Sequence, residues 1–271
     1  MITRVRLLAS LGAGGVIYLT PMAFNQFGFN ATQIGIGIAI AALVGTFSRF
    51  LSGFLLDTRV SCSWLLSCSC LFTLFADISL LKANVFTSYL LGQVLIGFAA
   101  GIYWPAAELA VPLSCGNFSS RRGYALVRSA DALGMGLGAL LGTIAAAIGY
   151  IRLVYCFDAF CMISLLYIFS KVKLLKFGQR SNKSFDDNTH ISIQPRSHSW
   201  LIELAPILII SFVVTGIFAM LQSTLPLDMV RGGISRPALS EAISGSIISI
   251  QLLLLVIFQW PLGRWLADRT I

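Results

Sequence analysis

The chain has 271 residues, of which 57% are hydrophobic and 11% are charged, and it carries a formal net charge of +8. Soluble domains contain roughly 25% charged residues, so this composition excludes an ordinary soluble protein and indicates a membrane protein. The positive charge does not indicate nucleic-acid binding, because no long soluble segment is present to carry a basic binding face.

Apolar segments recur along the whole chain, each close to the roughly 20 residues that a membrane span needs. In chain order the spans are predicted at 7–25, 32–55, 63–81, 86–111, 123–148, 152–170, 201–222 and 239–262. Backbone polar groups in lipid must be hydrogen-bonded within the segment, so every span is predicted to be a helix. The first segment starts like a signal peptide but lacks a clear cleavage site, and we interpret it as an uncleaved span. The predicted fold class is all-α and polytopic.

Basic residues are divided unequally between the two sides of the predicted bundle. With the N-terminus inside, the inner segments contain Arg4, Arg6, Arg59, Arg121, Arg122, Lys171, Lys173, Lys176, Arg180, Lys183, Arg196, Arg264 and Arg269. The outer segments contain Lys82, Arg152, Arg231 and Arg236. Cytoplasmic loops are enriched in Lys and Arg, so we expect a cytoplasmic N-terminus in a plasma or inner membrane.

One long polar loop, residues 171–200, is basic and lacks apolar periodicity, and we expect a flexible cytoplasmic linker there. It separates six predicted helices in residues 1–170 from two in residues 201–271. The loop histidines, His190 and His198, do not stand at ligand spacing from any of the six cysteines, and no Cys-x-x-Cys pair occurs. No metal site or cofactor is therefore predicted.

A short motif follows the second predicted span and recurs after the eighth. Its residues are Gly53, Leu55, Asp57 and Arg59 in the first copy and Leu266, Ala267, Asp268 and Arg269 in the second. The aspartates lie 211 residues apart (268 − 57), a period that suits two six-helix repeats with a linker. The motif resembles G-x-L-a-D-r-x-G-R-R of the major facilitator superfamily, although the later Gly and basic pair are missing after Arg59.

The resemblance implies a major facilitator helix bundle that moves a small molecule by alternating access. It also implies that the motif takes part in gating. The Gly would allow two helices to approach closely, and the Asp would make contacts that bias inward-facing against outward-facing states. In that family the second copy joins helices 8 and 9, so helices 9–12 would be missing here. We therefore expect a truncated fragment that is inactive alone, or an eight-helix protein completed by a partner chain or a second copy; the oligomeric state stays open.

A glycine pattern in the fifth predicted span, "GMGLGALLGT", contains Gly134, Gly138 and Gly142. It resembles the G-x-x-x-G-P-x-x-G-G pattern of drug–proton antiporters, with Ala139 replacing the Pro and Thr143 the last Gly. The resemblance implies proton-coupled efflux. Helix packing by small residues explains the same spacing equally well.

Ionisable residues inside predicted spans are costly and usually face a cavity or a partner. Arg128 and Asp131 are three residues apart on one helical face, so we expect them to pair locally. The pair either lines a central cavity, where it binds substrate charge or exchanges a proton, or only lowers the cost of insertion.

Glu108 lies between two prolines, Pro105 and Pro112, which favour a distorted helix. We expect Glu108 to face the same cavity, with Tyr103 and Trp104 in its wall. Trp104 would serve equally well as an anchor at the membrane interface.

Three further acidic residues, Asp77, Asp158 and Glu203, are expected near helix ends, where water or headgroups solvate them. No phosphate-binding Gly-rich loop and no catalytic Ser, Cys or His constellation is found, so an ATP-driven pump and an enzyme are not predicted. The favoured function is proton-coupled efflux of a small molecule. The alternatives are a nutrient or sugar symporter and a non-transporting receptor or assembly protein.

Overall fold

The computed structural model describes residues 1–58, 60–115, 120–171, 199–233 and 235–267. For residues 199–203, 259, 260, 262–264, 266 and 267 it describes the backbone alone. The described part of the chain is all-α, as predicted, and has eight helices long and apolar enough to cross a membrane. They are α1 (Ile2–Gln26), α2 (Ala31–Asp57), α3 (Cys62–Leu81), α4 (Phe86–Ser114), α5 (Ser120–Ala147), α6 (Leu153–Lys171), α7 (Ser199–Arg231) and α8 (Glu241–Ala267).

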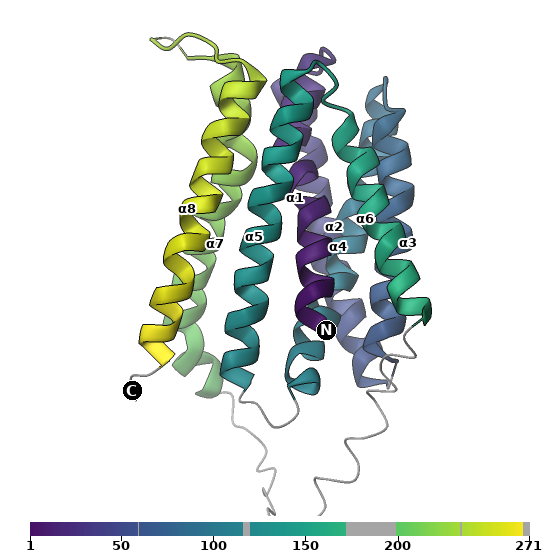
Figure 1. Ribbon diagram of the computed structural model, residues 1–271, viewed down its shortest axis with the longest axis vertical. Coiled ribbons are helices and arrows are strands. Elements are labelled where there is room, and N and C mark those ends of the chain that lie inside the picture. The colour runs from purple at the N-terminus through teal and green to yellow at the C-terminus, as the bar shows by residue number, and fades with distance from the viewer. Residues whose placement is uncertain (59, 116–119, 172–198, 234, 268–271) are drawn as a thin grey trace, which may run out of the picture.

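The helices run side by side along the long axis of the molecule (Figure 1). Helix α1 packs against α5 and α6, α4 packs against α2 and α3, and α3 also contacts α6. Helices α7 and α8 stand at one side of the bundle, where α8 packs against α5 and α7 against α1. The lower end in Figure 1 holds the starts of α1, α3, α5 and α7, and the upper end holds the starts of α2, α4, α6 and α8.

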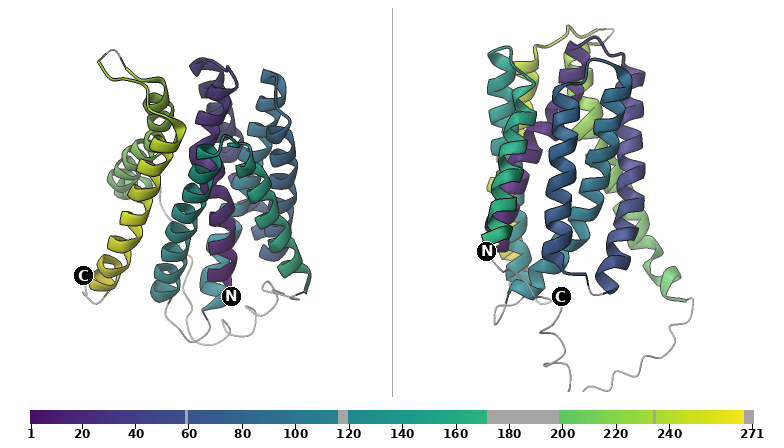
Figure 2. Two further views of the ribbon diagram at one scale, coloured as in Figure 1. Left: turned by 45° about the horizontal axis from the view of Figure 1, so that its top comes forward. Right: turned by 90° about the vertical axis from the view of Figure 1, so that its right-hand side faces the viewer.

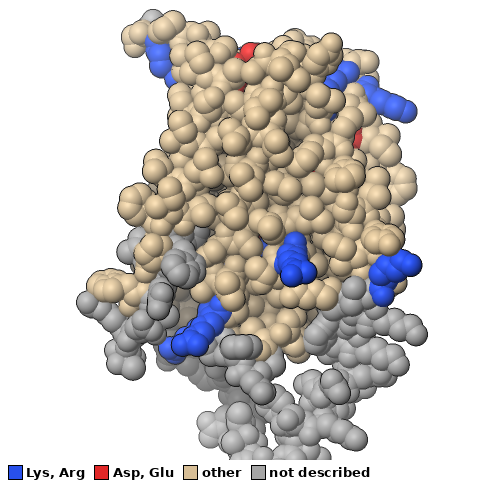
Figure 3. Space-filling view, in the orientation of Figure 1, with Lys and Arg blue, Asp and Glu red and all other residues tan. Residues whose placement is uncertain are grey.

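Charged side chains are distributed as expected for a protein embedded in lipid. A broad belt of uncharged residues crosses the face in Figure 3, with Lys and Arg above and below it. Large apolar side chains are exposed on the same bundle, including Phe47, Phe50 and Phe212, which are 74%, 75% and 80% exposed. In water such a surface would drive association, whereas lipid tails accommodate it.

The turn between α1 and α2 illustrates how local chemistry ends and starts these helices. Gly28 has φ of 85°, a left-handed conformation that Gly adopts without a steric penalty. Asn30 then caps α2: its side chain accepts from Gln33 N at 2.7 Å, and the Gln33 side chain accepts from Asn30 N at 3.0 Å. This reciprocal capping satisfies two otherwise unpaired backbone donors.

Helix α5 approaches α1 at glycines. A Cβ at Gly134 would lie 2.6 Å from Leu7 O, and one at Gly138 would collide with Leu11 O. Both contacts involve backbone, which cannot move aside without separating the helices. The close approach of α1 and α5 is therefore specific to Gly at these positions. It also brings the first turns of α1 against the charged residues of α5. Gly142 lies on the same face, where its Cβ would contact Leu19 and Val154.

Three helix boundaries lie five or more residues from those predicted, and one of them is the end of α8, at Ala267 rather than residue 262. Helix α7 continues to Arg231 rather than ending at residue 222, and Pro226 lies inside it. Helix α1 starts at Ile2 rather than residue 7, and Arg6, assigned above to a cytoplasmic segment, is buried within the bundle with 1% of its surface exposed. The apolar pattern ends at the first charge, but a helix continues wherever its charges find partners inside the protein.

The contact between the last two helices and the rest is unequal along its length. Near the upper end, Gly245 of α8 lies directly against Thr143 of α5, and the hydroxyls of Thr143 and Ser249 are 3.4 Å apart. At the same end, Arg231 donates to Asn25 Oδ1 at 2.8 Å and to Phe29 O at 3.0 Å. Toward the lower end α8 diverges from α5 (Figure 2).

Candidate functional site

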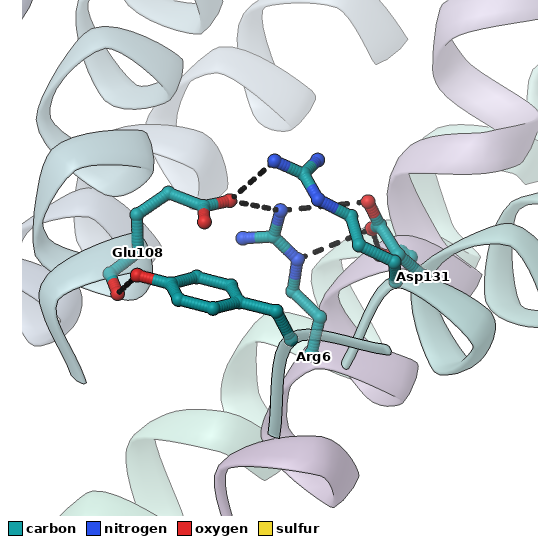
Figure 4. Close-up of polar contacts among 6 residues, drawn as sticks. Arg6, Glu108 and Asp131 are labelled. Carbon is teal, nitrogen blue, oxygen red and sulfur yellow. Dashed lines mark hydrogen bonds and ion pairs between the residues drawn. The ribbon is translucent and has the colours of Figure 1, made fainter. Parts of the chain in front are cut away.

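Four charged side chains from three helices meet toward the lower end of the bundle (Figure 4). Arg6 comes from α1, Glu108 from α4, and Arg128 and Asp131 from α5; we call them the Arg6 cluster. Arg6 Nε lies 3.2 Å from Asp131 Oδ1, and Arg6 Nη2 lies 3.3 Å from Glu108 Oε1. Arg128 Nη2 lies 3.0 Å from the same oxygen of Glu108. Two guanidinium groups and two carboxylates thus form one chain with balanced charge.

Asp131 is held by two side chains that lie one turn apart on the same face of α1. Arg6 Nη2 donates to its Oδ2 at 3.4 Å, and the Ser10 hydroxyl donates to its Oδ1 in a short hydrogen bond. The approach of Arg6 Nε to Oδ1 is an ion pair without hydrogen-bond alignment. Asp131 is buried, so these groups replace the water that would solvate its charge.

Two aromatic side chains of α4 support the Arg6 guanidinium. Its Cζ lies 4.0 Å from the ring centroid of Trp104 and 5.4 Å from that of Tyr103. A cation over an aromatic face is attracted by the ring quadrupole, and more strongly where water is excluded. Arg6 is therefore held by two carboxylates and two rings. Trp104 thus contacts the buried Arg6 guanidinium inside the bundle.

The ion pair expected between Arg128 and Asp131 is not formed. Arg128 reaches across to Glu108 on α4, and Asp131 reaches to Arg6 on α1. The spacing on α5 does place the two residues on one face, but each finds an opposite charge on another helix. Arg6 is the member that the sequence reasoning missed, because it precedes the apolar run used to define the first span. An Arg so close to a span, in a chain with acidic residues inside other spans, was the available signal.

Two cavities meet at this cluster. One, of about 150 Å³, lies among α1, α3, α4, α5 and α6, and its wall includes Tyr103, Trp104 and Asp131. The other, of about 350 Å³, lies between α1 and α5 on one side and α7 and α8 on the other, and its wall includes Arg128, Asp131, Gln222 and Gln251. Asp131 belongs to both walls. Glu108 belongs to neither of these two walls and contacts Arg6 and Arg128 instead.

The charge balance of the Arg6 cluster determines what it can do chemically. Removing one partner of a buried ion pair leaves an uncompensated charge, which is strongly unfavourable. A proton added to Asp131 or Glu108 would therefore weaken the hold on an arginine and leave it able to bind an anionic or hydrogen-bond-accepting group. The arrangement links the protonation of a carboxylate to the availability of an arginine.

The first copy of the repeated motif lies at the lower end of α2. Leu55 is half-buried and Asp57 is exposed in the last turn, followed by Thr58 as the C-cap. A Cβ at Gly53 would meet no atom within 4 Å, so the close helix approach expected there is not made. Arg59, Asp268 and Arg269 lie outside the described residues, and Leu266 and Ala267 are described only as backbone of α8.

The expectation that Asp77 and Asp158 are solvated near helix ends is wrong. Both are buried, with 1% and 2% of their surfaces exposed. Their helices do end nearby, but α3 and α6 pack against each other and cover both side chains. Glu203 is described only as backbone. Within the described residues no group of three or more His, Cys, Asp or Glu side chains forms a candidate metal site, and the six cysteines are free thiols.

Comparisons with known proteins agree with the fold. The family model described as Major Facilitator Superfamily matches residues 5–271. The crystal structure of the nucleoside transporter NupG is similar, with a TM-score of 0.71 and 12% sequence identity over 98% of this chain and 67% of that chain. A search of curated proteins found no match. The chain belongs to the Major Facilitator Superfamily and is a multi-pass integral membrane protein of the transporter class.

Proposed function

We propose that this protein moves a small molecule across the membrane by alternating access, coupled to proton movement in the opposite direction. The observation that carries the proposal is the position of Asp131, which lies in the walls of both cavities and is paired with the buried Arg6. A carboxylate at this junction is accessible to substrate and to protons, and its charge state determines whether Arg6 is free.

The coupling step is a competition for Asp131. When Asp131 and Glu108 are ionised, Arg6 and Arg128 are engaged and the cluster is neutral. A substrate with a cationic or hydrogen-bond-donating group can bind ionised Asp131 in place of an arginine, whereas protonation removes the negative charge that this binding needs. Binding of the substrate and binding of the proton then exclude each other, as exchange requires.

The orientation follows from the charge distribution. With the N-terminus in the cytoplasm, as the excess of Lys and Arg in the inner segments favours, the lower end of the bundle faces the cytoplasm. The cavity between α5 and α8 then lies on the cytoplasmic side of their upper contact. We assign residues 1–170 to a six-helix unit, 171–200 to a cytoplasmic linker, and 201–271 to the first two helices of a second unit.

The glycines of α5 favour efflux over uptake, through their resemblance to the antiporter pattern. NupG is a nucleoside transporter, but a likeness at this identity concerns the fold, so the substrate class is left to measurement. A symporter of nutrients remains the second candidate, because protonation of Asp131 would free Arg6 for an anionic group, and a substrate bound in this way would move together with the proton.

The test is proton movement in vesicles that contain the purified chain. A panel of drugs, sugars and nucleosides is added in the presence of an imposed pH gradient, and internal pH is followed with a dye. We expect a substrate-dependent proton flux that Asp131→Asn abolishes, while exchange of labelled substrate persists. The control is Asp228→Asn, which removes an acidic side chain 58% exposed and paired with Arg236. Absence of any flux across the panel would favour a receptor, an assembly protein or an inactive fragment. Retained coupling in Asp131→Asn would make the cluster structural.

A further inference from the structure

A second pair of carboxylates lies outside the Arg6 cluster. Asp77 belongs to α3 and Asp158 to α6, and the two helices pack directly against each other. Both side chains are almost completely buried. The exchange proposed for Asp131 makes no use of either residue.

These two carboxylates lack the partners that buried charges normally have. Neither oxygen of Asp77 nor Oδ1 of Asp158 has a hydrogen-bond partner in the described structure. No ion pair involves either residue there, since all four ion pairs lie elsewhere. A buried ionised carboxylate without a partner is strongly unfavourable, and two of them on helices that pack together are more so.

The groups around the pair do not supply a positive charge. Those whose charges interact with it are the thiols of Cys70, Cys156 and Cys161 and the hydroxyl of Tyr155, which are ordinarily neutral near pH 7. The Tyr155 hydroxyl donates to Thr20. Among charged groups of the helices packed nearby, Arg6 and Asp131 belong to the Arg6 cluster. Arg152, just before α6, donates to Ala83 O and to Asn84 Oδ1.

Asp158 connects the carboxylate pair to a cavity outside the contact between α3 and α6. Asp158 lies in the wall of the 150 Å³ cavity, together with Ser69 and Thr73 of α3 and with Asp131. Helix α1 makes room for it: a Cβ at Gly12 would collide with Asp158 Oδ1. An oxygen of Asp158 therefore packs against α1 at the edge of the cavity. Asp77 is not part of the cavity wall.

We propose that Asp77 and Asp158 together bind one proton, which they exchange through the cavity at Asp158. Uptake converts one carboxylate to a carboxylic acid, and the charge of the pair changes from −2 to −1. A metal cation fits less well, because Na⁺ and Ca²⁺ need several converging oxygen ligands and the described residues supply only two carboxylates here. The inference does not depend on transport.

Infrared spectroscopy of the purified 271-residue chain in lipid nanodiscs tests the proposal directly. A protonated carboxyl in an apolar site gives a C=O stretching band separate from ionised carboxylates. We expect such a band, and expect it to titrate with pH. Asp77→Asn and Asp158→Asn should each remove or shift it, whereas Asp228→Asn at the surface should leave it unchanged. A band that neither substitution alters would overturn the proposal, as would the absence of any band.

Three further measurements keep the result interpretable. Asp77→Glu and Asp158→Glu retain a carboxyl, so if an Asn variant does not fold, a shifted band in the Glu variant supports the pair and an unshifted one contradicts it. Gly12→Ala should move the titration midpoint, because its methyl group displaces Asp158. Loss of the band on adding Na⁺ or Ca²⁺ at constant pH would overturn the proton in favour of a metal ion. An intact band alongside absent flux would contradict the transport proposal alone.

Discussion

The two acidic sites of this bundle balance their charges in different ways. In the Arg6 cluster, two carboxylates face two arginines at 3.0–3.3 Å, and aromatic rings cover the buried cation. At Asp77 and Asp158, two more deeply buried carboxylates have no cation beside them in the described structure. Both sites border the same cavity through Asp131 and Asp158.

The difference separates stability from proton binding. A paired carboxylate stays ionised and stabilises the fold only while its partner is present, whereas an unpaired one is relieved by a proton. Substitutions that remove a charge should therefore act in opposite directions at the two sites.

The largest effect is expected from Arg6→Met, which keeps a long apolar stem beside Trp104 but leaves Asp131 and Glu108 without their buried partner. We expect the free energy of unfolding to fall by about 3–5 kcal/mol, measured by denaturant unfolding in detergent. The double variant Arg6→Met/Asp131→Asn should recover part of this loss. Simple additivity of the two single effects would show that the ion pair carries no coupling energy.

A smaller effect is expected from Gly138→Ala, because the added methyl group meets Leu11 O and separates α5 from α1. Overpacking of this kind costs about 1–3 kcal/mol and should also weaken the Arg6 cluster, which needs the two helices together. Gly53→Ala is the matched control: nothing lies within 4 Å of its Cβ, so we expect no loss and a gain of at most about 1 kcal/mol. Equal effects of both substitutions would contradict the role assigned to the α1–α5 contact.

Asp77→Asn is expected to raise the free energy of unfolding, in contrast to the two substitutions above. The substitution removes a buried charge that has no partner but keeps a polar amide, so the free energy of unfolding should rise by about 1 kcal/mol at pH 8. The gain should shrink at low pH, where the wild-type pair holds its proton. Thermal unfolding across a pH series measures both, and a loss of stability at pH 8 would indicate that the ionised pair is compensated.

The smallest effect is expected from Arg128→Gln. Its side chain is 49% exposed, and the pair with Glu108 is therefore screened by solvent. Such pairs contribute about 0.2–1 kcal/mol, so unfolding should change little by the same denaturant assay. A loss as large as that of Arg6→Met would show that both arginines are equally necessary to the fold.

Much of the fold could be predicted from the sequence, because lipid leaves the backbone few alternatives. The apolar runs predict all eight helices, and α3 and α4 begin within a residue of their expected starts. The boundary of α1 could not be predicted in this way, since hydropathy treats Arg6 as a reason to end a span. Whether a charge is tolerated depends on residues more than a hundred positions away, on α4 and α5.

The sequence predicted which residues form the candidate site better than it predicted which of them pair. The structure brings Glu108, Arg128 and Asp131 together, with Tyr103 and Trp104 beside them, but the pairing runs between helices rather than along α5. Asp77 and Asp158 were expected to be solvated because the sequence shows only how close each residue lies to a helix end. Burial depends on which neighbour covers that position, and the packing of α3 on α6 determines it.

The contact between Gly245, Ser249 and Thr143 near the upper end gives the last two helices a fulcrum. Below it, α8 can act as a lever arm that borders the 350 Å³ cavity at Gln251, Leu255 and Phe258. A small rotation about the fulcrum becomes a larger sweep at Phe258, which lies farther along the arm. The cavity can therefore shrink by tilting of a stiff rod, with the Thr143 contact kept and no helix unwound.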